Sequence, residues 1–275
     1  MRISSSVNTK IDHWAVRQLG DYDARNPGTM FSEGLSLDVA SAYQLQTAVS
    51  KLRCQRGERV IGYKVGCTSA KIRTQLGIEH CVTGRLYDTE QYPSRSRLPL
   101  DQFACLAIEG ELAVELSKEP CEDDFREGQL PRCVSRVFPV IELHHHVMRS
   151  VPPSAGELIA NNAIHAGVVE AEQTDSLATS IGEELNDTVR LSIFVDDNEV
   201  EHCQGRELIE TIHTSLQWLQ QVLKERGDSL RAGERILTGS IPSLIPIQSA
   251  CQVRVEAPPF GEVEAEFIES ETGSP

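Results

Sequence analysis

The chain has 275 residues, of which 40% are hydrophobic, and a formal net charge of −15. That length fits one large domain, or one domain with a smaller attachment, and the apolar fraction is enough for a sizeable core. The acidic balance argues against nucleic acid and anionic membranes as partners, because proteins bind both largely through Lys and Arg. The chain has no apolar run of about 18 residues, so we expect no membrane-spanning helix.

Cysteine usage and the N-terminal sequence predict a cytoplasmic protein. The eight cysteines are scattered and form no Cys-x-x-Cys pair, so neither a zinc ribbon nor a thioredoxin-type motif is present. In a chain of this length we expect reduced, mostly structural thiols. The polar stretch Met1–Lys10 lacks the apolar region of a secretory signal peptide.

Apolar residues at helical spacing predict two helices in the N-terminal part of the chain. The first helix carries an apolar face made of Ile11, Trp14, Ala15 and Leu19. The second follows Ser36, a suitable N-cap residue, and ends at Gly57. We therefore predict an N-terminal helical subdomain over residues 1–58.

From Arg59 onward, short strands separated by turns replace the helical pattern. The predicted strands of this body cover 60–65, 105–116, 137–143, 191–195, 235–238, 244–247, 252–256 and 262–268. The segment 120–128 is acidic and turn-rich, which is typical of a surface excursion.

One hairpin and one amphipathic helix stand out in the second half of the chain. The strand 191–195 meets turn residues at Asp196–Asn198 and returns through Glu199 and Val200. The helix has apolar residues from Leu208 to Leu223 at spacings of three and four. The fold class is therefore α+β, with a mainly β body over residues 59–275.

Two carboxylates separated by one residue lie on the predicted strand 105–116. Glu109 and Glu111 point to the same face, about 6.5–7 Å apart, because a strand alternates its side chains and rises about 3.3 Å per residue. That spacing lets both reach one hard cation. The alternative is a half-buried strand with a solvated acidic face, which is the commoner situation for alternating Glu.

Glu142 lies in the apolar strand 137–143, where an exposed carboxylate would be out of character. A buried carboxylate needs a partner, a metal or a proton. Three carboxylates without an obligatory Cys or His are typical of a site for Mg²⁺ or Mn²⁺. An alternative transition-metal site uses His144 and His146, which would share the strand face of Glu142.

Lys64 lies in a segment bracketed by glycines, Gly62-Tyr63-Lys64-Val65-Gly66. The segment is not a phosphate-binding P-loop, since no Gly-Lys-Ser/Thr follows at the required spacing. Either Lys64 is partly buried, which would lower its pKa and suit it to proton transfer, or its stem packs while the ammonium reaches water. The segments around Asn161-Asn162 and Thr238 are weak evidence by themselves, because such residues are common in turns.

Taken in order, several segments resemble the fumarylacetoacetate hydrolase superfamily, and within it the 2-keto-4-pentenoate hydratase branch. They span most of the chain from about Val60 onward, and their shared order carries the resemblance. The matching segments are Gly62–Gly66, Gly84-Arg85-Leu86, Glu109-Gly110-Glu111, Pro139–Glu142, Ala160-Asn161-Asn162-Ala163 and Ile236–Gly239. Glu142 at the third acidic position, where hydrolase relatives more often carry Asp, favours the hydratase and decarboxylase branch.

The resemblance implies a metal-dependent enzyme acting on a 2-keto acid or its dienol. It assigns Glu109, Glu111 and Glu142 to a Mg²⁺ or Mn²⁺ ion and Lys64 to the substrate pocket. The cation would stabilise an enolate while Lys64 moves a proton or stabilises charge. The residues that we expect to bind substrate are Ser69, Arg85, Asn161, Asn162 and Thr238.

The sequence departs from the hydratase pattern near the predicted pocket. Many hydratases carry Ala-Asp-Asn where this chain has Asn161, and an acidic residue where it has Val82. These changes remove candidate acid/base partners, and His165 either replaces them as a catalytic residue or has a structural role.

We therefore expect a cytoplasmic, homo-oligomeric hydratase that adds water to a 2-hydroxydienoate or 2-keto-enoate. One alternative is a 2-keto acid decarboxylase on the same scaffold, because the same enolate-stabilising site supports both reactions. The other is a non-catalytic relative that binds a keto acid or a protein partner. No nucleic acid or membrane is expected as a partner.

Overall fold

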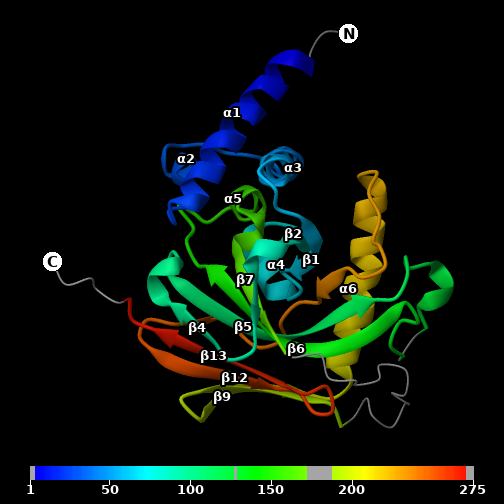
Figure 1. The fold of residues 1–275 in the computed structure, drawn as a ribbon. Helices are drawn as coiled ribbons and strands as arrows, with labels where there is room; N and C mark the ends of the chain where they lie inside the picture. Colours follow the sequence, from blue (N-terminus) through cyan, green and yellow to red (C-terminus); the bar gives the residue numbers. More distant parts are fainter. Residues whose placement is uncertain (1–3, 127–128, 172–187, 271–275) are drawn as a thin grey trace.

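Helices α1, α2, α3 and α5 gather at one end of a body that is built from two β-sheets (Figure 1). The computed structural model describes residues 4–126, 129–171 and 188–270. The α-helices are α1 (Ser4–Asp23), α2 (Thr29–Ser32), α3 (Val39–Gln55), α4 (Ala70–Leu76), α5 (Ala155–Ala160) and α6 (Arg206–Glu225). The 3₁₀ helices are η1 (Asp88–Glu90), η2 (Leu100–Gln102), η3 (Glu122–Asp124) and η4 (Asn162–Ile164). This architecture confirms the predicted α+β class.

The two predicted N-terminal helices are present as α1 and α3. The N-cap of α3 is Asp38 rather than the predicted Ser36, because the Asp38 carboxylate accepts a hydrogen bond from the Ser41 backbone N–H at 2.7 Å. Gly57 follows the last turn of α3 with a φ of 106°, which glycine adopts without steric cost. The predicted end of this helix is therefore confirmed.

The larger sheet has the strand order β2-β1-β10-β5-β6-β7-β3, and β11 also pairs with β5. Its strands are β1 (Val60–Gly66), β2 (Val82–Tyr87), β3 (Gln91–Pro93), β5 (Leu106–Leu116), β6 (Val134–His145), β7 (His165–Glu170), β10 (Arg235–Leu237) and β11 (Ile245–Pro246). The smaller sheet has the order β4-β13-β12-β8-β9. Its strands are β4 (Ser96–Pro99), β8 (Arg190–Val195), β9 (Asn198–Gln204), β12 (Cys251–Glu256) and β13 (Glu262–Ile268).

The main hydrophobic core lies between the two sheets. Ile108, Leu112 and Val114 of β5 are buried there together with Ile193 and Val255 of the smaller sheet. These residues of β5 form the apolar face that strict alternation predicts. Removing the core from water supplies the main favourable free energy of folding.

The opposite face of the larger sheet is also covered, so its acidic residues are not a solvated face. Apolar side chains from five strands meet on this side, because the sheet curls around them: Leu86, Ala113, Phe138, Val140, Val168 and Leu237. Helices α1, α2, α3 and α5 form a third apolar cluster next to it, which includes Val82 of β2. Glu111 on this inner face is only 2% exposed.

The predicted boundary between a helical subdomain and the body falls between α3 and β1. Helix α3 ends at Gln55 and β1 begins at Val60. Helix α5, from the middle of the chain, packs in the same apolar cluster as α1 and α3. The division of the chain at residues 58 and 59 stays a prediction.

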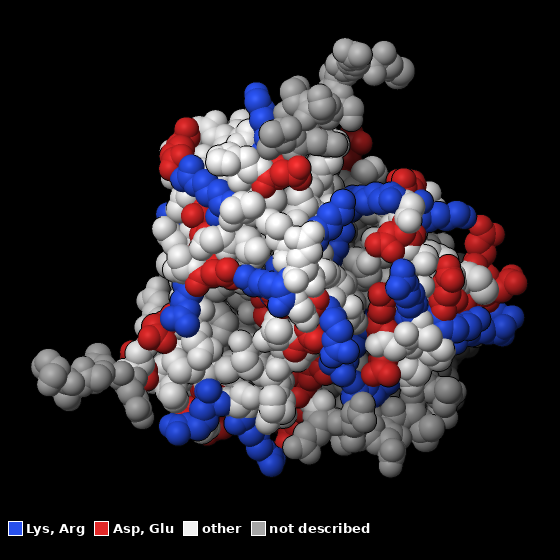
Figure 2. Space-filling model, turned by 45° about the horizontal axis from the view of Figure 1, so that its top comes forward, with Lys and Arg blue, Asp and Glu red and all other residues white. Residues whose placement is uncertain are grey.

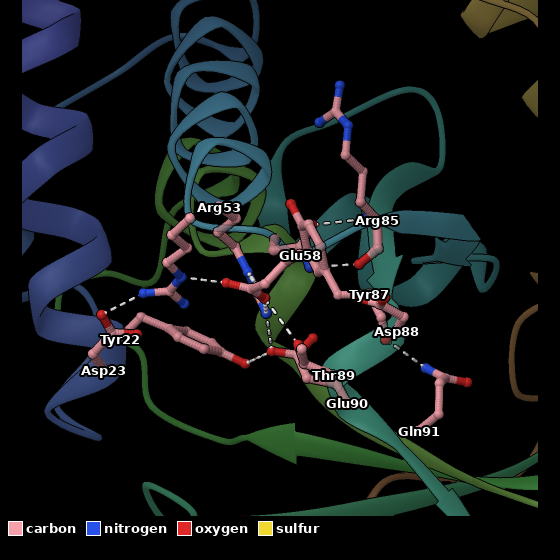
Figure 3. Close-up of polar contacts among 12 residues, drawn as sticks. Tyr22, Asp23, Arg53, Glu58, Arg85, Tyr87, Asp88, Thr89, Glu90 and Gln91 are labelled. Carbon is pink, nitrogen blue, oxygen red and sulfur yellow. Dashed lines mark hydrogen bonds and ion pairs between the residues drawn. The ribbon is translucent and has the colours of Figure 1, made fainter.

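A buried ionic network joins α1 and α3 to the larger sheet (Figure 3). Arg53 of α3 forms ion pairs with Glu58 and Glu90. Its guanidinium also lies over the ring of Tyr87, 3.6 Å from the centroid. Tyr22 of α1 donates its hydroxyl proton to Glu90. One cation therefore ties both long N-terminal helices to β2 and η1.

The predicted hairpin and amphipathic helix are confirmed as β8–β9 and α6. Asp196 and Asp197 form the turn between the strands, with φ angles of 48° and 63°. Helix α6 stands along one side of the sheets and buries Leu208, Leu216 and Leu223 in the main core (Figure 1). The four strands predicted near the C-terminus correspond to β10, β11, β12 and β13.

The predicted surface excursion 120–128 is only partly described, because its last two residues lie outside the described residues. Its first part contains η3 and the buried Asp124. All eight cysteines are free thiols. Within the described ranges no helix has the length and hydropathy to cross a membrane.

Candidate metal centre

The pairing of β5 with β6 places two carboxylates opposite each other. In this antiparallel register Glu109 faces Glu142, and Glu111 faces Val140. Directly opposed residues share a face of the sheet, as do residues two apart in one strand. Glu109, Glu111 and Glu142 therefore project from the same face, as their spacing predicts.

Glu142 is a buried anion that uses one of its oxygens for two partners, a lysine and a histidine. Its Oε1 accepts hydrogen bonds from Lys64 Nζ and from His165 Nδ1, both at 2.7 Å. Burial by itself raises the pKa of Glu142, but Lys64, His144 and His165 hold it well below its usual range. The second oxygen, Oε2, lies 3.7 Å from His144 Nε2.

Lys64 is the buried cation of this cluster, with 3% of its surface exposed. It also donates to the backbone carbonyl of Ala163 at 3.3 Å. Burial by itself lowers the pKa of Lys64, but Glu142 and Glu109 raise it above its ordinary value. The lowered pKa considered for a buried Lys64 is therefore wrong, since the anion beside it outweighs the loss of solvent.

Glu111 is buried beside these charges. Its Oε2 accepts a hydrogen bond from the backbone N–H of Gly239, whereas Oε1 has no partner within the described part of the chain. Burial, and then the negative charges of Glu142 and Glu109, raise the pKa of Glu111 well above its usual range. Gly239 can approach because its φ is 96° and a Cβ there would lie 2.5 Å from Thr68 Cγ2.

His144 completes a compact group with the two opposed carboxylates. Its Nε2 lies 3.3 Å from Glu109 Oε2 and 3.7 Å from Glu142 Oε2. One donor atom from each of the three residues lies within 4.8 Å of the other two. The structure therefore brings two of the predicted glutamates together with one histidine of the alternative site, while His146 is exposed.

These donors fit a divalent cation. Carboxylate oxygens and an imidazole nitrogen are ordinary ligands for such ions, and their separations match ligands around one centre. Buried carboxylates that lie close together repel each other and lose solvation, so a cation would stabilise the cluster. The donor set suits Mg²⁺ or Mn²⁺, and the full ligand set stays a prediction.

The turn η4 closes the cluster from the side of β2. The Asn162 side chain accepts from the Arg85 backbone N–H at 2.7 Å and donates to the Arg85 carbonyl at 2.8 Å. This pairing holds the following carbonyl, that of Ala163, beside Lys64. Gly84 is required at the contact, since a Cβ there would lie 2.6 Å from the Asn162 carbonyl oxygen. Asn162 thus positions the turn rather than facing the carboxylates.

Arg85, predicted to bind substrate, points to the other face of the sheet. β1 and β2 pair so that Arg85 lies opposite Tyr63, whereas Lys64 lies opposite a glycine. Because neighbours along a strand alternate, Arg85 and Lys64 project to opposite sides. The Arg85 guanidinium donates instead to Gln46 and Thr47 of α3.

The structure also places three other predicted substrate-binding residues outside the carboxylate cluster. Asn161 accepts a hydrogen bond from Gln18 of α1. Thr238 donates to the Leu112 carbonyl at 2.6 Å and so ties β10 to β5. Ser69 is exposed at the start of α4. Their assignment to substrate stays a prediction.

Two backbone groups contact the cluster without having been identified from the sequence. They are the N–H of Gly239 and the carbonyl of Ala163. Every residue carries a backbone carbonyl, and nearly every residue carries an N–H. Only an unusual backbone conformation could therefore distinguish these two positions in a sequence. Glycine after Thr238 is a weak signal of this kind, whereas nothing in the sequence predicts a φ of 53° at Ala163.

No protein-family model matches the chain. A 2-keto-4-pentenoate hydratase from Burkholderia vietnamiensis is 25% identical over 233 residues, which cover 84% of this chain and 87% of the relative. A solved 4-oxalocrotonate decarboxylase from Pseudomonas putida G7, complexed with magnesium and adipate, superposes with a TM-score of 0.82. It is 21% identical, and the match covers 95% of this chain and 98% of that one.

A more distant neighbour carries the name of the superfamily. A fumarylacetoacetate hydrolase family protein from Yersinia pestis superposes with a TM-score of 0.53 at 19% identity, covering 75% of this chain and 92% of that one. The sequence relatives cover most of both chains, and the solved structures share the fold. The chain is therefore similar in sequence to 2-keto-4-pentenoate hydratases, and it shares its fold with solved members of the fumarylacetoacetate hydrolase superfamily.

Proposed function

We propose that this chain is a metal-dependent hydratase that adds water to a 2-hydroxydienoate or 2-keto-enoate. The observation that carries the proposal is the group of the partly buried Glu109 with the buried Glu142 and His144, in which Lys64 and His165 both donate to the Glu142 carboxylate. The sequence relatives named 2-keto-4-pentenoate hydratase support the choice of reaction.

The metal of this proposal is Mg²⁺ or Mn²⁺, held by Glu109 and Glu142 with Glu111 beside them. When bound, such an ion would stabilise negative charge on the 2-oxygen of a keto acid as an enolate forms. Solved relatives are described as complexes with magnesium, calcium or Mn²⁺. The glutamates of this chain supply the hard oxygen donors that these ions prefer.

Lys64 and His165 position the Glu142 carboxylate by donating hydrogen bonds to it. Both donate to Glu142 Oε1, which fixes the carboxylate and leaves its Oε2 directed at the neighbouring donors. The raised pKa of Lys64 keeps its ammonium protonated at neutral pH, so it acts as a cation and hydrogen-bond donor. His165 Nε2 is buried and has no partner among the described residues, which leaves it available to a substrate.

The proposed substrate is a small 2-keto acid or its dienol, and the proposed state is a cytoplasmic homo-oligomer. A cationic ammonium and a divalent ion would together offset the global charge of −15 for an anionic substrate. Sedimentation velocity of the purified protein tests the assembly, and a single monomer species would contradict it.

Decarboxylation of a 2-keto dicarboxylate is the second candidate function. The specific observation in its favour is the TM-score of 0.82 with a solved 4-oxalocrotonate decarboxylase over 95% of this chain. A further relative of that name is 25% identical over 84% of the chain. Both reactions need the same stabilised enolate, so the site by itself does not separate them.

A direct assay separates the candidates. With Mn²⁺ present, the hydratase depletes the ultraviolet absorbance of a 2-hydroxydienoate, whereas a decarboxylase releases CO₂ from an oxalocrotonate-type substrate. Glu142→Gln should abolish the activity, and Glu115→Gln is the matched control, because Glu115 lies on the same face of β5 in a half-exposed pair with Arg136. Metal binding without either activity would contradict both and favour a keto-acid-binding protein.

A further inference from the structure

We propose that His144 is a direct nitrogen ligand of the metal, so that this chain binds its ion through Glu109, Glu142 and His144. The inference rests on the proposed function only in assuming that a divalent ion occupies this cluster. It differs from the three-glutamate site implied by the resemblance, because one ligand is an imidazole and Glu111 lies beside the group.

His144 is buried, and its ring makes no hydrogen bond within the described ranges. Only 2% of its side chain is exposed, and neither Nδ1 nor Nε2 has a hydrogen-bond partner among the described residues. An imidazole always carries at least one N–H donor, and the great majority of buried polar atoms are paired. In the described part of the chain, both ring nitrogens of His144 are therefore without a hydrogen-bond partner, and a metal ion bound to one of them would satisfy it.

The ring of His144 points its Nε2 toward two carboxylates. Nε2 lies 3.3 Å from Glu109 Oε2 and 3.7 Å from Glu142 Oε2. Adjacent ligands of an octahedral ion with bonds of about 2.1 Å are separated by roughly 3 Å. The three donor atoms, all within 4.8 Å of one another, are therefore spaced as ligands of one ion.

Some carboxylate oxygens of the cluster already accept hydrogen bonds, and this limits which oxygens are left for a metal. Glu142 Oε1 accepts from both Lys64 and His165, so Oε2, on the side of His144, is the oxygen left for a metal. Glu111 uses Oε2 for the backbone N–H of Gly239, and its Oε1, unpartnered among the described residues, is not part of the group of donor atoms that lie within 4.8 Å of one another. The opening shared by Glu109, Glu142 and His144 is thus the place where an ion finds three donors.

The neighbouring histidines show that this arrangement is specific to His144. His145 lies on the other face of β6, where its Nδ1 accepts from the Ala104 backbone N–H at 3.0 Å. Its ring packs against Tyr22, with centroids 5.0 Å apart. His146 is exposed just after the strand. Of the three consecutive imidazoles, only His144 projects between the carboxylates.

A nitrogen ligand changes which ions the site prefers. Mg²⁺ is bound mainly by oxygen, whereas the affinity of a site that includes nitrogen rises along the first-row series from Mn²⁺ through Co²⁺. We therefore expect the wild-type protein to bind Mn²⁺ and Co²⁺ more tightly than Mg²⁺, and this preference to shrink when the imidazole is removed.

Pulsed electron paramagnetic resonance of bound Mn²⁺ tests the proposal without relying on activity. We expect ¹⁴N modulation from a directly bound imidazole in the wild type, its loss in His144→Gln, and its retention in His146→Gln, the matched control. In calorimetric titrations His144→Gln should weaken Mn²⁺ binding by about tenfold to a hundredfold and Mg²⁺ binding by much less.

The outcomes separate this inference from the proposed function. Wild-type protein that binds Mn²⁺ without ¹⁴N modulation would overturn the ligand assignment and leave the metal-dependent function standing. Modulation that persists in His144→Gln would also overturn it, by pointing to another nitrogen. Protein that binds no divalent ion would overturn both. If His144→Gln does not fold, His144→Ala takes its place, and a wild-type spectrum without ¹⁴N modulation would still overturn the assignment.

Discussion

Glu142 balances the charges of the buried cluster. One of its oxygens accepts from Lys64 and His165 at 2.7 Å, and the other lies 3.7 Å from His144 Nε2. A buried carboxylate without such partners would take up a proton. Because Lys64 keeps it ionised, Glu142 is available as a metal ligand at neutral pH.

Replacing Lys64 by methionine should leave the buried Glu142 carboxylate without the cation that pairs with it. Both side chains are at least 95% buried, so we expect Lys64→Met to reduce the free energy of unfolding of the metal-free protein by about 3–5 kcal/mol. Mn²⁺ should restore part of the loss. Urea denaturation with and without Mn²⁺ measures both effects. Lys51→Met is the control, because Lys51 is an exposed lysine on α3. Equal stability of the two variants would contradict the role of Lys64 as the cation that stabilises Glu142.

Glu111 should make the metal-free protein less stable as pH rises. Its pKa in the folded state is raised by burial and by Glu142 and Glu109, so the folded state holds this proton more tightly than the unfolded state does. The stabilising effect is complete below the ordinary glutamate pKa and is lost as pH rises through the raised value.

Glu111→Gln should remove that loss, because glutamine keeps the shape and the acceptor for Gly239 without the charge. We expect the metal-free variant to be more stable than the wild type at neutral pH, with no such difference in acid. Thermal unfolding across the pH range measures this. If the wild type and the variant are equally stable at neutral pH, the pKa of Glu111 is not raised in the folded state.

The sequence predicted the carboxylate geometry but only part of its surroundings. Alternation along one strand was enough to place Glu109 and Glu111 on one face, and the apolar context of Glu142 predicted its burial. The direction of Arg85 was not predictable, because nothing in its segment indicated which face of β2 it would occupy. The raised pKa of Lys64 depends on a partner 78 positions away along the chain (142 − 64).

At the scale of elements, long periodic segments were predictable and short ones were not. The helices α1, α3 and α6 and the strand β5 carry regular apolar patterns that local physics decides. Helix α4 has no buried residue, and β3 and β4 have three and four residues, so no periodicity is available to identify them. The turn η4, with its left-handed Asn162 and Ala163, depends on tertiary contacts.

The ionic network around Arg53 should control how firmly the N-terminal helices are attached (Figure 3). Arg53→Met would leave Glu58 and Glu90 buried without their cation, at a cost of about 3–5 kcal/mol. Relative to the wild type, we expect Arg53→Met to speed amide hydrogen exchange in α1 and α3 more than in β5. Arg59→Met is the control, because Arg59 forms an exposed ion pair with Asp88. Unchanged exchange in α1 would contradict this role.

At the scale of the whole molecule, an acidic protein is proposed to bind an anionic substrate. The face shown in Figure 2 carries Asp and Glu interspersed with Lys and Arg, and the net charge is −15. The global field therefore repels the substrate, and the buried Lys64 acts only at short range.

Salt should accordingly increase substrate capture. At saturating Mn²⁺ we expect kcat/KM for an anionic substrate to rise roughly twofold or more between about 0.01 and 0.15 M ionic strength, as the screening length shortens from about 30 Å to 8 Å. Steady-state kinetics measure the change, and kcat at saturating substrate is the internal control. A fall in kcat/KM would show that local positive charge dominates.

The central claim is that Glu109 and Glu142 of the paired strands β5 and β6 hold a divalent cation. Calorimetric titration of Mn²⁺ into metal-free wild type, Glu142→Gln and the control Glu115→Gln tests it most directly. The account predicts one site per chain in the wild type and the control, and at least about a hundredfold weaker binding in Glu142→Gln. Wild-type affinity in folded Glu142→Gln would contradict it.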